Sequence, residues 1–313
     1  MVSDAGLREW RFFQGVPLMG WKLYVAKRAL VNRLPFGESM RGLKRRLLGY
    51  PPDLGNLSDT LAGLRWMQDE LARTERSFKD AEVLEIGSGW FPCIPIALVM
   101  AGAKRVHMTD LNRHMDQVTF SATLAFLRDR FPAEPALSGV QRVEDLPLSY
   151  HAPFNVEEIP DSSLDCVVSR TVLEHIAPED LTSLLSRLKP KLKPGGLMVH
   201  LVDHSDHMEH RDKSISKVNF LQWTPDFHRR INGLIREGEN RLRHHQYVEV
   251  FAAAGYAVQS VANRLHEPTL HSVPSLKLAA PFDQMAAADI AVLASVYVVR
   301  PTDATKNEGS SAR

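Results

Sequence analysis

The stretch from Val83 to Pro92, VLEIGSGWFP, combines residue types that bind small charged ligands. A short apolar run ends at Glu85, and Gly87, Ser88 and Gly89 follow almost directly. Glycines let the backbone approach a ligand without an intervening side chain. The stretch therefore predicts a buried strand that leads into a nucleotide-binding turn.

A second acid lies where a ribose would need it. Asp110 ends the apolar segment RVHMTD, about 20 residues beyond the glycines, and a carboxylate at the tip of the second strand suits the two hydroxyl groups of a ribose. This arrangement fits NAD and S-adenosylmethionine equally well. The residues of the turn must therefore separate the two ligands.

The residues after Gly89 disfavour a dinucleotide. A pyrophosphate needs free amides at a helix N-terminus, together with a third glycine for close packing of the helix on the strand. Trp90 and Phe91 occupy these positions, and Pro92 lacks an amide hydrogen. Glu85 would place negative charge beside a pyrophosphate, whereas it suits a cationic amino-acid group. We therefore predict S-adenosylmethionine, with Trp90 reshaping the turn.

Strands alternate with helices from residue 82 onward, which predicts a parallel sheet covered on both faces. The expected strands are 82–86, 105–110, 164–170 and 196–203, and the expected helices are 92–103, 114–131, 179–192 and 243–254. Two last strands, 256–263 and 289–299, lack a crossover helix between them and are expected to form an antiparallel pair at one edge. We predict a doubly wound, mostly parallel α/β fold, and the family resemblance given below implies that its sheet is seven-stranded.

Three regions are expected along the chain: an N-terminal helical cap (1–78), a Rossmann-like domain (79–301) that binds S-adenosylmethionine, and a disordered polar tail (302–313). Residues 1–50 carry ten Lys or Arg against three Asp or Glu. This bias is typical of a solvated helical face, and an edge that meets an anionic substrate or a membrane is the alternative.

Composition disfavours several classes of protein. The formal net charge of +1 gives no reason to expect a nucleic-acid partner. No uncharged window is long enough for a transmembrane span, and the N-terminus does not read as a signal peptide. Cys93 and Cys166 fit buried free thiols in a reducing compartment. We therefore expect a cytoplasmic protein, whose oligomeric state the sequence leaves open.

Four segments in order resemble the signature blocks of class I, Rossmann-like, S-adenosylmethionine-dependent methyltransferases. They are EIGSG (85–89), Asp110, SLDCVVSRTVLEHI (163–176) and LKPGGLMVHLVD (192–203), and the resemblance covers about residues 80–205. The chain departs from the usual E/D-x-G-x-G-x-G pattern at Phe91. The GSGWFP turn and the DHSDH loop after residue 202 resemble a bacterial subgroup of this family.

The resemblance implies a set of contacts with the cofactor. The implied cofactor-binding residues are Glu85, Gly87, Ser88, Gly89, Trp90, Asp110, Leu111, Asn155, Arg170 and Thr171. Among them, Glu85 and Gly87 would line the methionine moiety, Asp110 would hold the ribose and Leu111 would pack on the adenine.

Three further contacts have simpler alternatives. Asn155, in YHAPFNVEEIP, would meet the edge of the adenine, but it could instead be a turn residue. Arg170 and Thr171, at the end of the fourth strand, would lie beside the transferred methyl group, although Arg170 could instead form a surface ion pair.

Seven of the 13 histidines lie between His200 and His245. In the resembling fold, the loop DHSDHMEHRD faces the acceptor substrate, and His175 of LEHI lies on the opposite wall. If the acceptor is a hydroxyl group, a base must remove its proton, and imidazole is suited to this near neutral pH. The candidate catalytic residues are therefore His204, His175 and His207.

Two alternatives stay open for this loop. The histidines could be structural, or His204 and His207 could bind a metal ion with Asp203 or Asp206. The imidazoles of His204, His207 and His210 along one short helix would not all converge on one ion, so our interpretation includes no metal.

We expect methyl transfer from S-adenosylmethionine to a hydroxyl or amine of a small-molecule or glycan-like acceptor. The main alternative is a cyclase or aminobutyryl transferase, in which attack at the aminobutyryl carbon releases methylthioadenosine, and the unusual GWFP turn gives it some support. A third alternative, a non-catalytic binding protein, would be expected to lose Glu85 or Asp110, and both are present.

Overall fold

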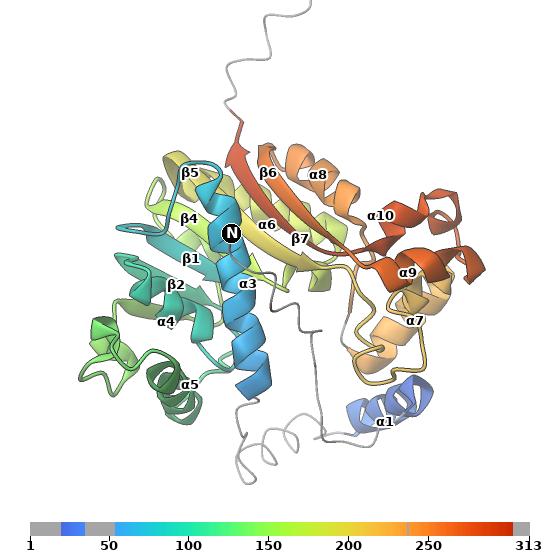
Figure 1. The fold of residues 1–313 in the computed structure, drawn as a ribbon, viewed down its shortest axis with the longest axis horizontal. Coiled ribbons are helices and arrows are strands. Elements are labelled where there is room, and N and C mark those ends of the chain that lie inside the picture. The colour runs from blue at the N-terminus through green and yellow to red at the C-terminus, as the bar shows by residue number, and fades with distance from the viewer. Residues whose placement is uncertain (1–19, 35–53, 237, 303–313) are drawn as a thin grey trace, which may run out of the picture.

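The computed structural model describes residues 20–34, 54–236 and 238–302, and a seven-stranded sheet lies at its centre (Figure 1). The strands are β1 Glu82–Ile86, β2 Arg105–Thr109, β3 Leu148–His151, β4 Leu164–Arg170, β5 Leu192–Asp203, β6 Tyr256–Leu265 and β7 Val292–Pro301. Their order is β3-β2-β1-β4-β5-β7-β6, and all neighbours are parallel except for β7, which runs antiparallel between β5 and β6. The predicted α/β fold and its antiparallel pair are confirmed.

Helices cover both faces of the sheet. The helices of the described residues are α1 Trp21–Arg33, α3 Leu54–Ala72, α4 Cys93–Met100, α5 Gln117–Arg130, α6 Pro178–Leu188, α7 Pro225–Ile235, α8 His244–Ala253, α9 Glu267–Ser272 and α10 Ala287–Ala291. α3, α4 and α5 lie on one face, where Met67 and Leu98 are buried against the strands. α6 and α8 lie on the other face, where Leu185 and Phe251 are buried. Both faces are thereby removed from water, as a parallel sheet requires.

Two helices differ from their expected ends for local reasons. α5 begins at Gln117, and not at 114, because the side chain of Asp116 accepts a hydrogen bond of 2.9 Å from the Thr119 amide and caps the helix. α6 ends at Leu188, and not at 192, because Pro190 cannot continue an α-helix.

β3 is the strand whose position the sequence did not reveal. Its four residues, LSYH, are all half-buried, so they form neither a buried run nor an alternation. β3 pairs with β2 alone and brings the loop that follows it to the end of β2.

Two helices of the expected cap lie within the described chain. α3 packs directly on the sheet and on α4. α1 packs on α7 instead, where Val25 shares a buried cluster with Ile231 and Ile235, and Figure 1 shows both helices on the side that carries α9 and α10. The other parts of the cap, 1–19 and 35–53, and residues 303–313 of the expected tail, lie outside the described residues.

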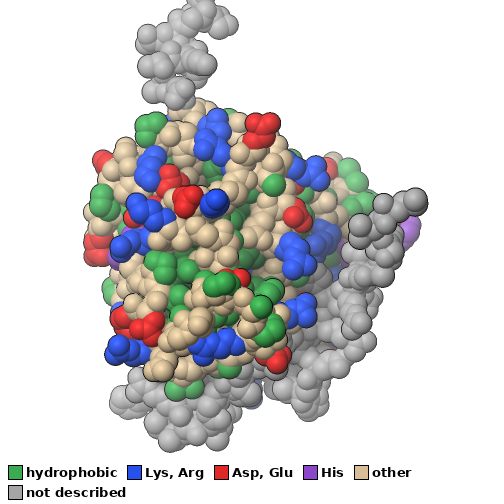
Figure 2. All heavy atoms as spheres, turned by 60° about the vertical axis from the view of Figure 1, so that its left-hand side comes forward, with side chains coloured by type: hydrophobic (Ala, Val, Ile, Leu, Met, Phe, Trp, Pro, Cys, Tyr) green, Lys and Arg blue, Asp and Glu red, His purple; other side chains and the backbone are tan. Residues whose placement is uncertain are grey.

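Charged side chains are mixed over the side of the molecule that carries α4 and α5. Figure 2 shows Lys and Arg side chains lying among Asp and Glu there, with apolar side chains between them. The described part of this face therefore shows no preference for a ligand of one charge.

Candidate active site

The turn after β1 is built from two glycines with left-handed backbone conformations. Gly87 has φ +75° and Gly89 has φ +67°, values that favour glycine. The amides of Gly87 and Ser88 both donate hydrogen bonds of 2.9 Å to the carbonyl of Thr109, which fixes the turn to the end of β2. A Cβ on Gly87 would lie 2.6 Å from a methyl group of Val172, whereas one on Gly89 would meet no atom of the described residues within 4 Å. Open space therefore lies beside Gly89, and this is a cradle that a side chain would fill.

Asp110 faces the same space from the end of β2. Its Oδ2 accepts a hydrogen bond of 3.0 Å from the Gly89 amide, and its Oδ1 accepts one of 2.8 Å from the Leu111 amide. A carboxylate accepts about four hydrogen bonds, so capacity for a diol remains. The Leu111 side chain is 79% exposed, which leaves an apolar surface beside the carboxylate. This pairing suits a nucleoside, with the diol on Asp110 and the base on Leu111.

Trp90 lies on the Asp110 side of the turn. Its ring centroid is 4.9 Å from that of His114, and Nε2 of His114 lies 3.6 Å from Oδ1 of Asp110. Trp90 therefore lies near the expected ribose site, and its effect on the shape of the turn stays a prediction.

Glu85 supplies negative charge beneath the turn. The residue is 3% exposed, and its carboxylate accepts a hydrogen bond from the Ser88 hydroxyl. Burial raises the pKa of Glu85 to about 7, although the hydrogen bond from Ser88 opposes this effect. A cationic ligand group beside Glu85 would favour the ionised carboxylate.

Arg170 is the last residue of β4, and Thr171 follows it. Thr171 has φ +51°, a strained conformation for a β-branched residue, and its amide donates a hydrogen bond of 2.8 Å to the carbonyl of Leu201. Burial lowers the pKa of Arg170, and the charges of Glu174 and Asp203 oppose this effect. The strained turn and the buried guanidinium therefore lie together at this strand end, and their contact with the cofactor stays a prediction.

Asn155 lies in the loop after β3, which is tied to Asp110. The Asp110 carbonyl accepts a hydrogen bond of 2.9 Å from the Phe154 amide. The side-chain oxygen of Asn155 accepts a bond of 3.2 Å from the Glu157 amide and caps a short 3-10 helix. Asn155 therefore has the turn role that its sequence context also indicated, and its contact with adenine stays a prediction.

The structure separates His204 from the other candidate bases. His204 is 2% exposed, and its Nε2 lies 3.0 Å from the hydroxyl of Ser295 on β7. Its carbonyl accepts a hydrogen bond of 2.7 Å from Arg243, and burial lowers the pKa of His204 well below its usual value. This position is typical of a structural histidine, so the role of His204 as a base stays a prediction that its burial disfavours.

His175 and His207 do lie together, with ring centroids 5.0 Å apart. Nδ1 of His175 lies 2.7 Å from the carbonyl oxygen of Gly238, which only accepts hydrogen bonds, so Nδ1 carries the proton and Nε2 keeps a lone pair. Loss of water around its ring lowers the pKa of His175 and favours the neutral ring, although the residue as a whole is exposed. Nε2 of His175 can therefore accept a proton or ligate a metal ion.

Three carboxylates act on His207. Its Nδ1 lies 3.2 Å from Oε1 of Glu239, and its Nε2 lies 3.6 Å from Oδ2 of Asp203. Burial alone would lower the pKa of His207, but the charges of Glu239, Asp203 and Glu174 raise it to about 10. The region around His207 therefore attracts positive charge.

Sequence reasoning missed Glu174 and Glu239 as members of this cluster. Asn240 brings them together, because its amide donates a hydrogen bond of 2.7 Å to the carbonyl of Glu174 and its side chain binds the carbonyls of Leu173 and Ile176. The only local signal is the acid next to His175 in LEHI, since the contact with residues 239–240 spans more than 60 residues of the chain.

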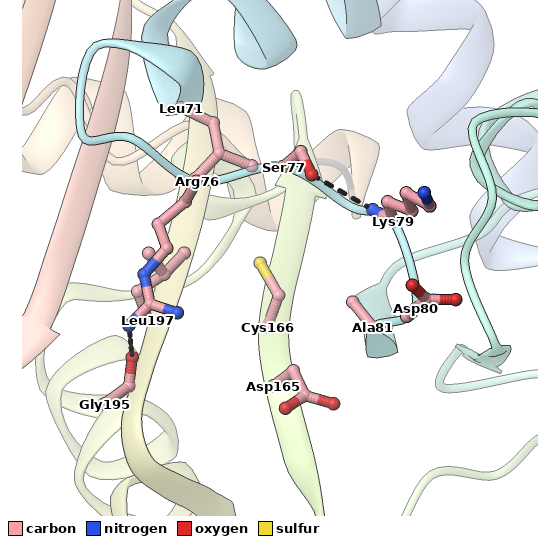
Figure 3. A pocket seen from close by; sticks show the side chains of 10 residues that line it. All are labelled: Leu71, Arg76, Ser77, Lys79, Asp80, Ala81, Asp165, Cys166, Gly195 and Leu197. Atoms are coloured by element: carbon pink, nitrogen blue, oxygen red, sulfur yellow. Dashed lines mark hydrogen bonds between the residues drawn. The ribbon is translucent and has the colours of Figure 1, made fainter.

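A separate cavity of about 130 Å³ lies at the opposite ends of the strands (Figure 3). Its lining includes Ala81 before β1, Asp165 near the start of β4, and Arg76, whose guanidinium donates a hydrogen bond of 3.2 Å to the carbonyl of Gly195. Ligands of open α/β sheets bind at the carboxyl ends of the strands. This cavity is therefore not the candidate site.

Comparisons with known proteins agree with this geometry. A family model described as a methyltransferase domain matches residues 62–261. No curated protein sequence matches the chain significantly. Among the described residues, no helix is long and apolar enough to cross a membrane.

Three solved structures illustrate the likeness in fold. An S-adenosylmethionine-dependent methyltransferase from Mesorhizobium loti is 15% identical with a TM-score of 0.44, and the match covers 74% of this chain and 95% of that one. The 1,6-didemethyltoxoflavin-N1-methyltransferase of Burkholderia thailandensis is 16% identical with a TM-score of 0.45, over 93% of this chain and 94% of that one. A putative sarcosine dimethylglycine methyltransferase from Galdieria sulphuraria is 15% identical with a TM-score of 0.45, over 78% and 86% of the two chains. Because the family model spans well over half of the sequence, the chain belongs to the methyltransferase domain family, a family of transferases whose methyl donor is S-adenosylmethionine.

Proposed function

We propose that this methyltransferase transfers the methyl group of S-adenosylmethionine to a hydroxyl or amine of a small-molecule or glycan-like acceptor. The observation that carries the proposal is the Gly89 turn. Open space lies beside Gly89, whose amide binds the carboxylate of Asp110, and Ser88 of the same turn binds the buried carboxylate of Glu85. The GSGWFP turn and the DHSDH loop support membership of the bacterial subgroup that carries both motifs.

Each residue of the turn has a proposed role toward the cofactor. S-adenosylmethionine supplies an electrophilic methyl group on a sulfonium ion. Asp110 would hold the ribose hydroxyls and Leu111 would pack on the adenine, with Asn155 at its edge. Glu85 would attract the cationic amino group, and Gly87, Ser88, Gly89 and Trp90 would form the wall of the turn.

The acceptor would approach from the ends of β4 and β5. Arg170 and Thr171 would lie beside the methyl group, and His175 and His207 form the polar wall that follows them along the chain. Methyl transfer is an in-line displacement, so the protein mainly positions the two reactants and provides for the acceptor proton. We place the proton-handling residue among His175, His207 and His204, and Nε2 of His175 is the best placed because it keeps a lone pair.

The proposal also includes a division of the chain into a cap and a cofactor-binding domain, and a location in the cell. α1 packs on α7 beyond the DHSDH loop, so residues 1–78 would contribute a cap to the domain formed by residues 79–301. Cys93 and Cys166 are buried free thiols, which supports a cytoplasmic location.

An acceptor screen tests the proposed function. The untagged protein is incubated with S-adenosylmethionine that carries a trideuterated methyl group and with sets of hydroxylated and amine-bearing small molecules and glycans. Mass spectrometry should find an acceptor that gains the labelled methyl group in step with the release of S-adenosylhomocysteine. If S-adenosylmethionine is consumed but no acceptor gains the labelled methyl group, the proposal is contradicted.

A further inference from the structure

We propose that Glu174, His175 and His207 bind a divalent transition-metal ion, with Zn²⁺ as the best match. This metal site would lie at the acceptor side of the active site. Binding of the ion is independent of the proposed function, whereas the role of the ion in methyl transfer rests on that function.

The three side chains converge on one point. Each of Glu174, His175 and His207 offers one ligand atom, and these atoms all lie within 4.8 Å of one another. Ligands around a tetrahedral zinc ion at about 2.0–2.2 Å are separated by about 3.4 Å. A small inward movement of the side chains would therefore close the site. Two imidazole nitrogens and one carboxylate, with a position left for a further ligand, form a donor set that suits a zinc ion in an enzyme.

The buried carboxylate of Glu174 is the strongest evidence for a bound ligand. The residue is 3% exposed, and neither carboxylate oxygen has a hydrogen bond to another residue in the described parts of the chain. A buried carboxylate without a hydrogen-bond partner is costly. Arg170 acts on Glu174 through charge alone, without a hydrogen bond between them. A cation bound by both imidazoles and by Glu174 would provide the missing partner.

Both histidines are oriented as metal ligands are. Ligating histidines almost always donate their other ring N–H group to a carbonyl or a carboxylate. Nδ1 of His175 binds the carbonyl of Gly238 at 2.7 Å, and Nδ1 of His207 lies 3.2 Å from Glu239. In His175 this leaves Nε2 for an ion, whereas Nε2 of His207 lies 3.6 Å from Oδ2 of Asp203 and would exchange that carboxylate for the ion.

The carboxylate of Asp203 lies beside the proposed metal site. Oδ2 of Asp203 lies 3.6 Å from Nε2 of His207, while its Oδ1 accepts a hydrogen bond of 2.8 Å from the Ser205 amide. Asp203 could therefore become a fourth ligand without leaving the Ser205 amide. Together with Glu174 and Glu239 it places three carboxyl groups around two imidazoles, and these groups are oxygen and nitrogen donors for a divalent cation.

A second cluster of similar size lacks these features. His244, His245 and Asp289 also lie within 4.8 Å of one another. However, all three of its residues are only half-buried, and His244 contacts Asn263 at 3.3 Å and Asp289 at 3.2 Å through its two ring nitrogens. Within the described residues, this cluster holds no buried side-chain atom that lacks a hydrogen-bond partner, so it provides a matched control.

An ion at this place would select the acceptor. A divalent cation lowers the pKa of a hydroxyl group that it binds. Because Nε2 of His175 would then hold the ion and could not act as the base, the hydroxyl proton would pass to solvent. The new carbon–oxygen bond would form as the bond from the methyl group to sulfur breaks. We therefore expect an acceptor that offers oxygen atoms rather than an amine.

Metal titration of the full, untagged, chelator-treated protein tests the site. Calorimetry with Zn²⁺, and the visible spectrum with Co²⁺, should show one equivalent bound, with the intense Co²⁺ bands of a tetrahedral site. Glu174→Gln should weaken the affinity for Zn²⁺ tenfold or more, and His207→Ala should weaken it a hundredfold. His245→Ala in the control cluster should leave it unchanged.

Three outcomes would overturn the metal site: no stoichiometric binding, the same affinity in Glu174→Gln, or a loss only in His245→Ala. Thermal melting with and without Zn²⁺ covers variants that fold poorly, because Zn²⁺ should raise the Tm of the parent protein and not that of Glu174→Gln. S-adenosylmethionine affinity is measured on the same samples. If the parent protein binds S-adenosylmethionine but no metal ion, only the metal site is overturned. If the parent protein binds no S-adenosylmethionine, the result counts against the proposed function.

Discussion

The amide of Gly89 donates a hydrogen bond of 3.0 Å to Oδ2 of Asp110 and joins the turn after β1 to the end of β2. This bond holds a carboxylate at the rim of the open space beside Gly89. The carboxylate therefore has a fixed orientation before a ligand binds, which lowers the entropic cost of binding.

Replacement of Asp110 tests its role toward the ribose. Asp110→Ala should weaken the affinity for S-adenosylmethionine tenfold or more, because each hydrogen bond to a charged group contributes about 1.5–3 kcal/mol. Isothermal titration calorimetry measures this change. His114→Ala is the control, since it removes only the neighbour of Asp110 and should change the affinity far less. An unchanged affinity in Asp110→Ala would remove Asp110 from the cofactor site.

The affinity for S-adenosylmethionine should fall as the pH decreases through about 7. Burial raises the pKa of Glu85 to about 7, so its protonated form dominates below that pH. A cationic ligand needs the ionised form, and binding must then displace a proton, at a cost of up to about tenfold in affinity for each pH unit. Arg170 and Asp110 are the charged groups that act on Glu85, and both stay in place in the test. Glu85→Gln should bind more weakly and with a flat pH profile, and a sloping profile in that variant would assign the effect to another group.

The glycines of the turn can be tested against a matched glycine elsewhere. Gly87→Ala places a Cβ 2.6 Å from a methyl group of Val172, in addition to the cost of about 1–2 kcal/mol for a left-handed alanine. We expect it to lower the Tm and to abolish measurable cofactor binding. Gly139→Ala has a similar φ of +72° and meets no atom within 4 Å, so it should show only the backbone cost. Equal effects of both substitutions on cofactor affinity would contradict a direct role of the turn.

Substitution of His204 and of His175 should cause different defects, the first in stability and the second in turnover. His204→Ala should lower the free energy of unfolding by about 1–3 kcal/mol, because it removes a buried, hydrogen-bonded side chain. His175→Ala should slow turnover at least tenfold with little change in cofactor affinity. Thermal melting and turnover are compared for both variants. A His204→Ala protein with parental stability and cofactor affinity but much slower turnover would restore His204 as the base.

Most of the fold could be predicted from the sequence because its signals are local. EVLEI and the apolar helix CIPIALVM form buried runs, and the glycines that follow EVLEI mark the turn. β3 could not be located, because four half-buried residues at a sheet edge carry no periodic signal. The start of α5 could not be predicted from the apolar pattern, because it depends on the cap that the Asp116 side chain provides.

The acceptor side was harder to predict because distant segments form it. His204 and His207 lie three residues apart, a spacing that suggested a common wall. In the structure His204 contacts Ser295 on β7, whereas His207 turns toward His175 and Glu239. These contacts depend on the strand order and on the path of the chain after α7, which the spacing of histidines does not reveal.

Incubation of the pure protein with S-adenosylmethionine alone, followed by mass spectrometry of the products, tests the central claim most directly. We predict that the cofactor stays intact without an acceptor, and that calorimetry shows it bound. Methylthioadenosine formed in the absence of any acceptor would contradict methyl transfer, because the cofactor would then itself be the substrate of a cyclase or aminobutyryl transferase.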